Sequence, residues 1–180
     1  MRVISGKYKG KNLIGFDILG TRPTMDRVKE SLFGMIQTRL KDSMILDLFA
    51  GSGSLGIEAI SNGASSCYFV DNNSKLIDII RKNTINMNED INIIKKDYMD
   101  ALYYFKSINI KFDIIFLDPP YQMNLINNCL KKIDDFKLLN ENGIIVCEYE
   151  NEIINLSHRF VCFVLRPDQN LIDRNGQTVS

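Results

Sequence analysis

The sequence predicts an α/β domain in which helices cover both faces of a mostly parallel central sheet. Two observations predict this class. Short apolar runs, such as "IIFL" at 114–117, alternate along the chain with segments of helical periodicity. The runs are apolar throughout instead of at every second position, which is typical of strands buried on both faces of a parallel sheet. At 180 residues, the chain has room for one such domain with a single core.

The N-terminal part is expected to form an extension of this domain. Residues 2–16, "RVISGKYKGKNLIGF", predict a β-hairpin, because two short strand-like runs flank a turn rich in glycine and lysine. A helix is expected after Pro23, capped by Thr24, since apolar residues recur at steps of three and four as far as Leu40. We therefore expect an extension over residues 1–42 and a compact α/β domain over residues 43–180.

Within that domain, strands and helices are expected to alternate. The apolar runs predict six strands, at 44–49, 67–71, 91–97, 112–118, 143–150 and 159–165. The intervening periodic segments predict helices at 55–61, 74–88, 98–106 and 123–133.

Charge is unevenly distributed, although the formal net charge of the whole chain is zero. Residues 1–42 hold nine Lys and Arg against four Asp and Glu, so this part carries +5 and the remainder −5. A basic N-terminal segment of this kind can attract a polyanion. An ordinary solvated hairpin would carry the same lysines, so charge alone leaves both interpretations open.

Composition argues against several classes of protein. The sequence has no run of eighteen apolar residues, so no membrane span is expected. The segment "MRVISGKYKG" lacks the apolar part of a signal peptide, so we expect a cytoplasmic protein. The four cysteines form no Cys-x-x-Cys pair, and His158 is the only histidine, so we expect neither disulfides nor a metal site.

A glycine loop follows the first predicted strand. Gly51, Gly53 and Gly56 have G-x-G-x-x-G spacing between a strand and a helix, where glycine lets a ligand approach the backbone and a helix N-terminus. Asp71 ends the next strand and can accept both hydroxyls of a ribose. The sequence therefore predicts a cofactor that contains a nucleoside.

Asp47 indicates which cofactor. This acid lies four residues before Gly51, where it would repel the pyrophosphate of a nicotinamide cofactor but attract the ammonium and sulfonium groups of S-adenosylmethionine. Asp97 follows the third strand and could accept the adenine amine, cap the next helix, or do both.

The fourth strand ends in an unusual turn, Asp118-Pro119-Pro120-Tyr121. Two prolines fix two φ angles, so the turn is stiff. Because this strand is expected beside the first, Asp118 should face the methyl donor. Asp118 and a carbonyl within Pro119-Pro120 could accept the two N–H groups of a base amine, and Tyr121 could stack on the base. A rigid turn with no ligand would have the same sequence.

These motifs resemble a known family. "ILDLFAGSGSLGIEA", "FVDNN" and "FLDPPY", in this order, resemble class I S-adenosylmethionine-dependent methyltransferases that act on amino nitrogens. "MRVISGKYKGKNL" and "TRPTMDRVKESLFGMI" resemble the N-terminal hairpin and first helix of the RsmD family, which methylates a guanine N2 amine in small-subunit (16S) ribosomal RNA. The resemblance covers about residues 1–150 and implies a Rossmann-like fold.

The resemblance also implies three groups of site residues. The cofactor-binding group is Thr24, Asp47, Gly51, Ser52, Gly53, Asp71, Asn72 and Asp97. The catalytic group is Asp118, Pro119, Pro120 and Tyr121. The RNA-binding group is Arg2, Lys7, Lys9, Lys11, Arg22 and Arg27.

We therefore expect an enzyme that methylates the N2 amine of a guanine in small-subunit ribosomal RNA, acting as a monomer within an assembling 30S particle. Three alternatives remain at this point. An adenine-N6 methyltransferase of DNA or RNA would use the same turn. A ribosome-assembly protein could bind RNA with this fold but without catalysis, and a nicotinamide-dependent dehydrogenase is a more distant alternative.

Overall fold

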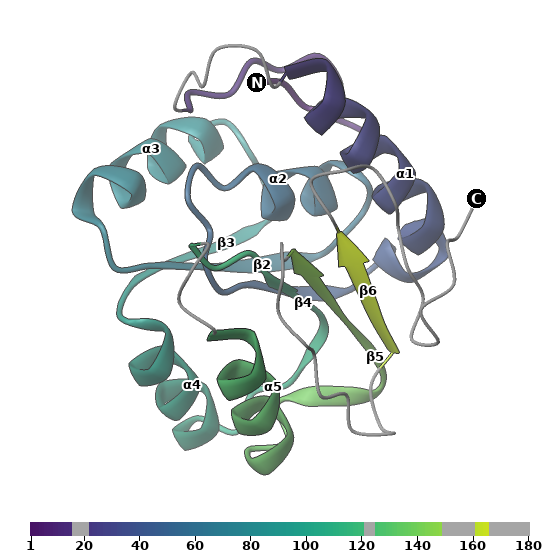
Figure 1. Cartoon of the computed structure of the whole chain (residues 1–180). Helices are drawn as coiled ribbons and strands as arrows, with labels where there is room; N and C mark the ends of the chain where they lie inside the picture. Colours follow the sequence, from purple (N-terminus) through teal and green to yellow (C-terminus); the bar gives the residue numbers. More distant parts are fainter. Residues whose placement is uncertain (16–21, 121–124, 149–160, 166–180) are drawn as a thin grey trace.

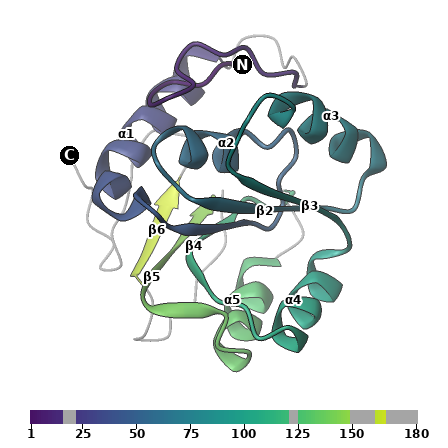
Figure 2. The same cartoon turned by 180° about the vertical axis from the view of Figure 1, so that it is seen from behind.

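The computed structural model describes residues 1–15, 22–120, 125–148 and 161–165, and in these a six-stranded sheet lies between two layers of helices (Figure 1). The strand order is β3-β2-β1-β4-β5-β6, and every neighbouring pair is parallel. Helices α1, α2 and α3 lie on one face, and α4 and α5 on the other (Figure 2). The predicted α/β class with a parallel sheet is confirmed.

Each predicted helix and strand of the α/β domain is present. In chain order the elements are α1 (Arg22–Leu40), β1 (Met44–Asp47), α2 (Ser54–Ser61), β2 (Ser66–Asp71), α3 (Ser74–Thr84), β3 (Asp90–Lys95), α4 (Tyr98–Ser107), β4 (Phe112–Leu117), α5 (Leu125–Asp135), β5 (Leu139–Glu148) and β6 (Val161–Leu165). Helix α3 ends four residues earlier than predicted, where the Met87 N–H turns back to the Thr84 carbonyl.

Two apolar clusters hold the layers together. Leu32 and Ile36 of α1 pack with Ile57 of α2 and the inner strands on one face. Phe105 of α4 and Ile133 of α5 belong to the cluster on the other face. Because both faces are covered, the central strands β1 and β4 are apolar except for Asp47 and Asp113.

The predicted N-terminal hairpin is present only as a single antiparallel bridge, between Arg2 and Asn12. Val3 N–H and Leu13 N–H bond across this segment, to the Lys11 and Met1 carbonyls. The other donors point to the domain: the Ile4 and Ser5 N–H groups donate to Glu58, and Lys7 N–H donates to the Ser61 carbonyl. These bonds attach residues 1–15, hereafter the N-terminal arm, to helix α2. Two regular strands are therefore replaced by a loop that docks on the domain.

The order of the strands determines where a ligand can bind. β1 lies at the centre, with β2 on one side and β4 on the other, so the connections leave β1 in opposite directions. In open α/β sheets, ligands bind beyond the carboxyl ends of the strands at such a switch point. The residues that follow β1, β2 and β4 are therefore the candidate site.

Candidate cofactor-binding and catalytic site

Three acids lie at the carboxyl edge around β1. Asp47 ends β1, Asp71 ends β2, and Asp118 directly follows β4. Asp47 is aligned with Phe69 of β2 and with Phe116 of β4, so Asp71 and Asp118 each extend two residues beyond it on either side. The predicted neighbourhood of the first and fourth strands is confirmed.

The glycine loop joins β1 to α2 and is held by Asp71. One Asp71 oxygen accepts a hydrogen bond from Gly51 N–H at 3.0 Å, and the other accepts one from Asn73 N–H at 2.8 Å. Gly51 and Gly53 have φ angles of 55° and 81°, a left-handed conformation that favours glycine. Asp71 thus positions the loop, while its predicted contact with a ribose stays a prediction.

The third glycine serves packing. A Cβ atom at Gly56 would lie 2.4 Å from a ring carbon of Phe69, so helix α2 could not approach β2 with a larger residue there. At Gly51, by contrast, a Cβ would meet no atom of the described residues within 4 Å. The Gly51 backbone is therefore uncovered by the described residues, whereas Gly56 is needed for α2 to pack against β2.

Asp47 is a buried acid whose charge is little compensated by neighbouring groups. Its side chain accepts a hydrogen bond from Gly56 N–H at 3.0 Å, and the residue is 1% exposed. Burial raises the pKa of Asp47 to about 7, and the charge of Asp71 adds to the rise. Within the parts of the chain that the structure describes, no Lys or Arg forms an ion pair with it. An incoming cation would stabilise its ionised form.

Asp118 is half-buried and also lies near other acids. Burial raises its pKa well above the ordinary value, and the nearby carboxylates of Glu148 and Asp47 raise it further. Glu148 ends β5, and the alignment of Leu117 with Cys147 places it level with Asp118. The sequence analysis did not identify Glu148, although an acid at the end of the fifth strand follows the same rule as the other acids.

Of the remaining predicted site residues, the structure describes some, and others lie outside the described residues. Asp97 caps α4 by accepting a hydrogen bond from Met99 N–H at 2.9 Å, which confirms the capping interpretation and leaves adenine binding a prediction. Pro119 is buried and Pro120 exposed, while Ser52 is half-buried and Asn72 exposed. Tyr121 and the side chains of Arg22 and Thr24 lie outside the described residues, so their binding roles stay predictions. The expected cap at Thr24 is wrong, because α1 already begins at Arg22.

The predicted RNA-binding residues lie on the N-terminal arm and on α1. Arg2, Lys7, Lys9 and Arg27 are exposed, and Lys11 is half-buried. Lys7 is already engaged: its ammonium lies 2.7 Å from Glu89, and this hydrogen bond raises the pKa of the lysine. The ammonium groups of Lys7 and Lys11 also lie over the ring of Tyr8, at 5.0 and 5.8 Å from its centre.

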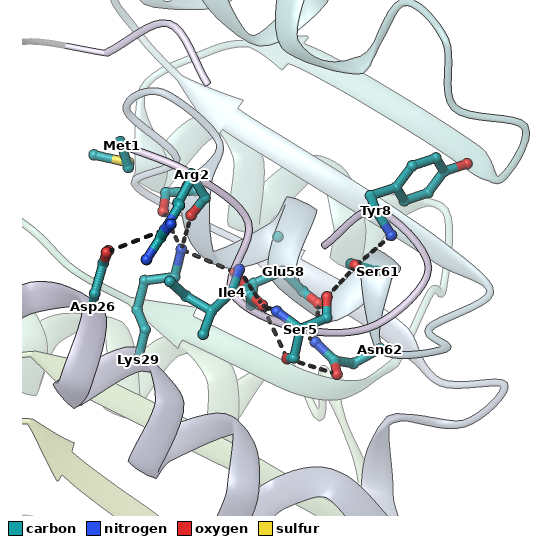
Figure 3. Close-up of polar contacts among 12 residues, drawn as sticks. Met1, Arg2, Ile4, Ser5, Tyr8, Asp26, Lys29, Glu58, Ser61 and Asn62 are labelled. Carbon is teal, nitrogen blue, oxygen red and sulfur yellow. Dashed lines mark hydrogen bonds and ion pairs between the residues drawn. The ribbon is translucent and has the colours of Figure 1, made fainter. Parts of the chain in front are cut away.

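Glu58 attaches the arm to the domain (Figure 3). Its carboxylate accepts hydrogen bonds from Ile4 N–H at 2.9 Å and from Ser5 N–H at 2.8 Å, and it pairs with Lys29 at 3.0 Å. Lys29 also donates to the Ser54 hydroxyl at 3.0 Å, at the first residue of α2. The sequence analysis missed this buried pair; an acid within the apolar helix "SLGIEAIS" was the available signal.

The described residues contain neither a metal-binding cluster nor a membrane-spanning helix. No group of three or more His, Cys, Asp or Glu side chains is arranged to bind a metal ion. No helix there combines the length and the apolar character needed to cross a membrane.

Comparison with known proteins shows the family to which this chain belongs. The family model described as "Conserved hypothetical protein 95" matches residues 1–168. Ribosomal RNA small subunit methyltransferase D of Haemophilus influenzae is 34% identical over 155 residues, covering 84% of this chain and 80% of that protein. This chain belongs to the RsmD family of methyltransferases.

Other RsmD-like proteins are also similar over most of their length. YlbH of Bacillus subtilis, named as a candidate rRNA methyltransferase, is 42% identical over 155 residues, covering 85% of this chain and 84% of that protein. The structure of yhhF of Escherichia coli, named as a candidate methyltransferase, superimposes with a TM-score of 0.77 at 27% identity and covers 91% of this chain and 88% of that one. The Rossmann-like class I fold expected for the RsmD family is therefore confirmed.

Proposed function

We propose that this protein transfers a methyl group from S-adenosylmethionine to the N2 amine of a guanine in small-subunit ribosomal RNA. In this proposal it acts as a cytoplasmic monomer on RNA within an assembling 30S particle. Residues 1–42 form the RNA-binding extension and residues 43–180 the catalytic domain. The names of relatives in H. influenzae and B. subtilis support the RNA substrate.

One observation carries the proposal: Asp118 and Asp47 extend from adjacent strands at the edge where the glycine loop opens. This places an acid suited to a base amine next to an acid suited to a cationic cofactor. The available residues fit S-adenosylmethionine, because the loop backbone is accessible at Gly51 and Asp47 lacks a cation among the described residues. When bound, this cofactor supplies an electrophilic methyl group.

The chain's own residues bind and orient the substrate. Asp118 and a carbonyl of Pro119 or Pro120 would accept the two N–H groups of the amine and so direct its lone pair toward the methyl group. The raised pKa of Asp118 makes its carboxylate a stronger base than an ordinary aspartate. It is therefore suited to take the proton that the amine loses as the new C–N bond forms.

A transfer assay tests the proposal. Tritium from labelled S-adenosylmethionine should appear in the ribosomal RNA of naked transcripts or of 30S particles, and digestion should release labelled N2-methylguanosine. Label found only in duplex DNA, or only in N6-methyladenosine, would favour the adenine-N6 alternative. RNA binding without any transfer would favour a non-catalytic assembly protein.

The matched variants for this assay are Asp118→Ala and Asp100→Ala. Asp118→Ala should abolish transfer, whereas Asp100→Ala, an exposed acid on α4, should transfer at the wild-type rate. Equal rates for both variants would remove Asp118 from the mechanism.

A further inference from the structure

Asn83 joins two segments that are distant in sequence. This residue lies next to the end of helix α3 and is 2% exposed. Its side-chain oxygen accepts a hydrogen bond from Ile14 N–H at 2.8 Å. Its side-chain nitrogen donates to the Ile14 carbonyl at 2.9 Å and to the Ser52 carbonyl at 2.9 Å.

These three bonds use both the donors and the acceptor of the Asn83 side chain. An amide side chain has two N–H donors and one carbonyl oxygen, so both donors are committed here. Aspartate has the same shape but would place a second oxygen against the two carbonyls. The position therefore requires an amide.

The partners of Asn83 belong to the two functional parts of the protein. Ile14 lies at the end of the N-terminal arm, which carries the predicted RNA-binding lysines. Ser52 is the central residue of the glycine loop, between two glycines in left-handed conformation. A backbone of this kind is conformationally permissive and needs external contacts to fix it.

Among the described residues, two side chains from outside the loop form hydrogen bonds with its Gly51–Gly53 backbone. Asp71 accepts the Gly51 N–H from the β2 side, and Asn83 donates to the Ser52 carbonyl from the α3 side. The Met1 sulfur also lies 3.8 Å from the Ser52 hydroxyl oxygen, so the arm contacts the loop directly. Displacing the arm would therefore remove part of what orients the loop.

We propose that Asn83 is a positioning residue that couples the N-terminal arm to the glycine loop, so that RNA binding on the arm and cofactor binding at the loop strengthen each other. The identity of the two ligands depends on the proposed function. Coupling of this kind is reciprocal, so each ligand must raise the affinity for the other by the same factor.

The variants are Asn83→Asp and, as a matched control, Thr84→Val. Thr84 is the next residue of α3, is also buried, and donates its hydroxyl hydrogen only within its own helix, to the Ile80 and Arg81 carbonyls. Both variants lose buried hydrogen bonds, but only Asn83→Asp disturbs the arm and the loop. A third variant, Ile14→Pro, removes the Ile14 N–H and leaves the Asn83 bond to Ser52 in place.

Calorimetry with S-adenosylhomocysteine and with a ribosomal RNA fragment tests the coupling. Asn83→Asp should weaken cofactor binding about tenfold, as expected for loss of a buried hydrogen bond, and should raise the KM for the cofactor more than it lowers kcat. Ile14→Pro should bind S-adenosylhomocysteine nearly normally, but in both variants this ligand should no longer raise the affinity for RNA. Thr84→Val should retain both properties.

Hydrogen exchange in the ligand-free chain tests the link without reference to any ligand. Asn83→Asp should accelerate exchange at the Ile14 amide and at the Gly51 and Gly53 amides, relative to Thr84→Val. If the wild type binds no cofactor but this acceleration is seen, the proposed function fails and the link stands. Equal exchange at these amides in the two variants, or unchanged coupling between the ligands, would overturn the proposal.

Discussion

Two buried carboxylates of the same strand–loop–helix unit have very different surroundings. Glu58 on α2 is 0% exposed, accepts hydrogen bonds from the backbone of Ile4 and Ser5, and pairs with Lys29 at 3.0 Å. Asp47 at the end of β1 is 1% exposed and accepts one hydrogen bond from Gly56 N–H.

The difference lies in how far each buried charge is compensated. A buried charge is costly unless it is paired and hydrogen-bonded. Lys29 and the arm offset that cost at Glu58, whereas burial raises the pKa of Asp47 to about 7. We infer that Glu58 holds the arm, and that Asp47, with Asp118 beside it, is reserved for charge that arrives with the cofactor and substrate.

The largest expected effect is on turnover in Asp118→Ala. We expect kcat to fall about a thousandfold, a loss comparable with removal of a principal electrostatic group from an active site. The affinity for S-adenosylhomocysteine should stay within a few-fold of the wild type, since Asp118 is assigned to the amine. Single-turnover kinetics and calorimetry measure the two quantities. A variant that retains wild-type kcat would place Asp118 with Glu58 among the structural acids.

Glu58→Gln should lower the free energy of unfolding by about 3–5 kcal/mol, because it leaves the buried Lys29 ammonium without its counter-charge. Urea denaturation measures this change. The control is Glu30→Gln, which alters an exposed acid on α1 in the same way. Adding Lys29→Met should restore part of the loss, since the uncompensated charge is then removed. If Glu58→Gln alone were as stable as Glu30→Gln, the Glu58–Lys29 pair would not hold the arm.

Asp47→Asn should have opposite effects on stability and binding. At pH 8 the ligand-free variant should be more stable than the wild type, by at most about 4 kcal/mol, because an ionised buried acid has been removed. Affinity for S-adenosylhomocysteine should fall at least about tenfold, since its ammonium loses a counter-charge. Thermal unfolding and calorimetry report the two changes. Loss of stability together with unchanged affinity would contradict the assignment.

The pH dependence of stability follows from the same acid. The pKa of Asp47 is raised from 3.8 to about 7 on folding, so the folded chain binds the proton more tightly than the unfolded chain. Its contribution to stability is therefore fully present below about pH 4, declines as the pH rises toward 7, and is absent above. Asp118 acts in the same direction. Denaturation between pH 4 and 8 should show a smaller decline in Asp47→Asn than in the wild type.

The smallest effects are expected on the arm. Lys9→Glu and Lys11→Glu should each weaken RNA binding and lower the salt slope by about 0.7, as for one lost contact with single-stranded phosphate. Lys7→Glu should lower that slope less, because Glu89 already pairs with Lys7. Filter binding from 50 to 300 mM salt distinguishes the three. An unchanged slope in all of them would place the RNA elsewhere.

The sheet and its edge were predictable because their signals are local. Apolar runs gave the strands, and the glycine loop with Asp47, Asp71 and Asp118 marked the carboxyl ends. A helix-capping role for Asp97 was likewise visible from its place before a helical segment.

The contacts of the arm were not predictable, because they join residues far apart in sequence. Ile4 bonds Glu58 across 54 positions, and Ile14 bonds Asn83 across 69. No local pattern distinguishes an asparagine that fixes two backbones from one on the surface. The predicted hairpin is short for a similar reason, because the Ile4, Ser5 and Lys7 N–H groups donate to the domain.

A crystal structure with S-adenosylhomocysteine tests the central claim most directly. We expect the ligand over the Gly51–Gly53 backbone, with its ammonium toward Asp47 and its sulfur facing the Asp118 carboxylate. A ligand bound away from this edge, or an Asp118 carboxylate turned from the sulfur, would contradict the account.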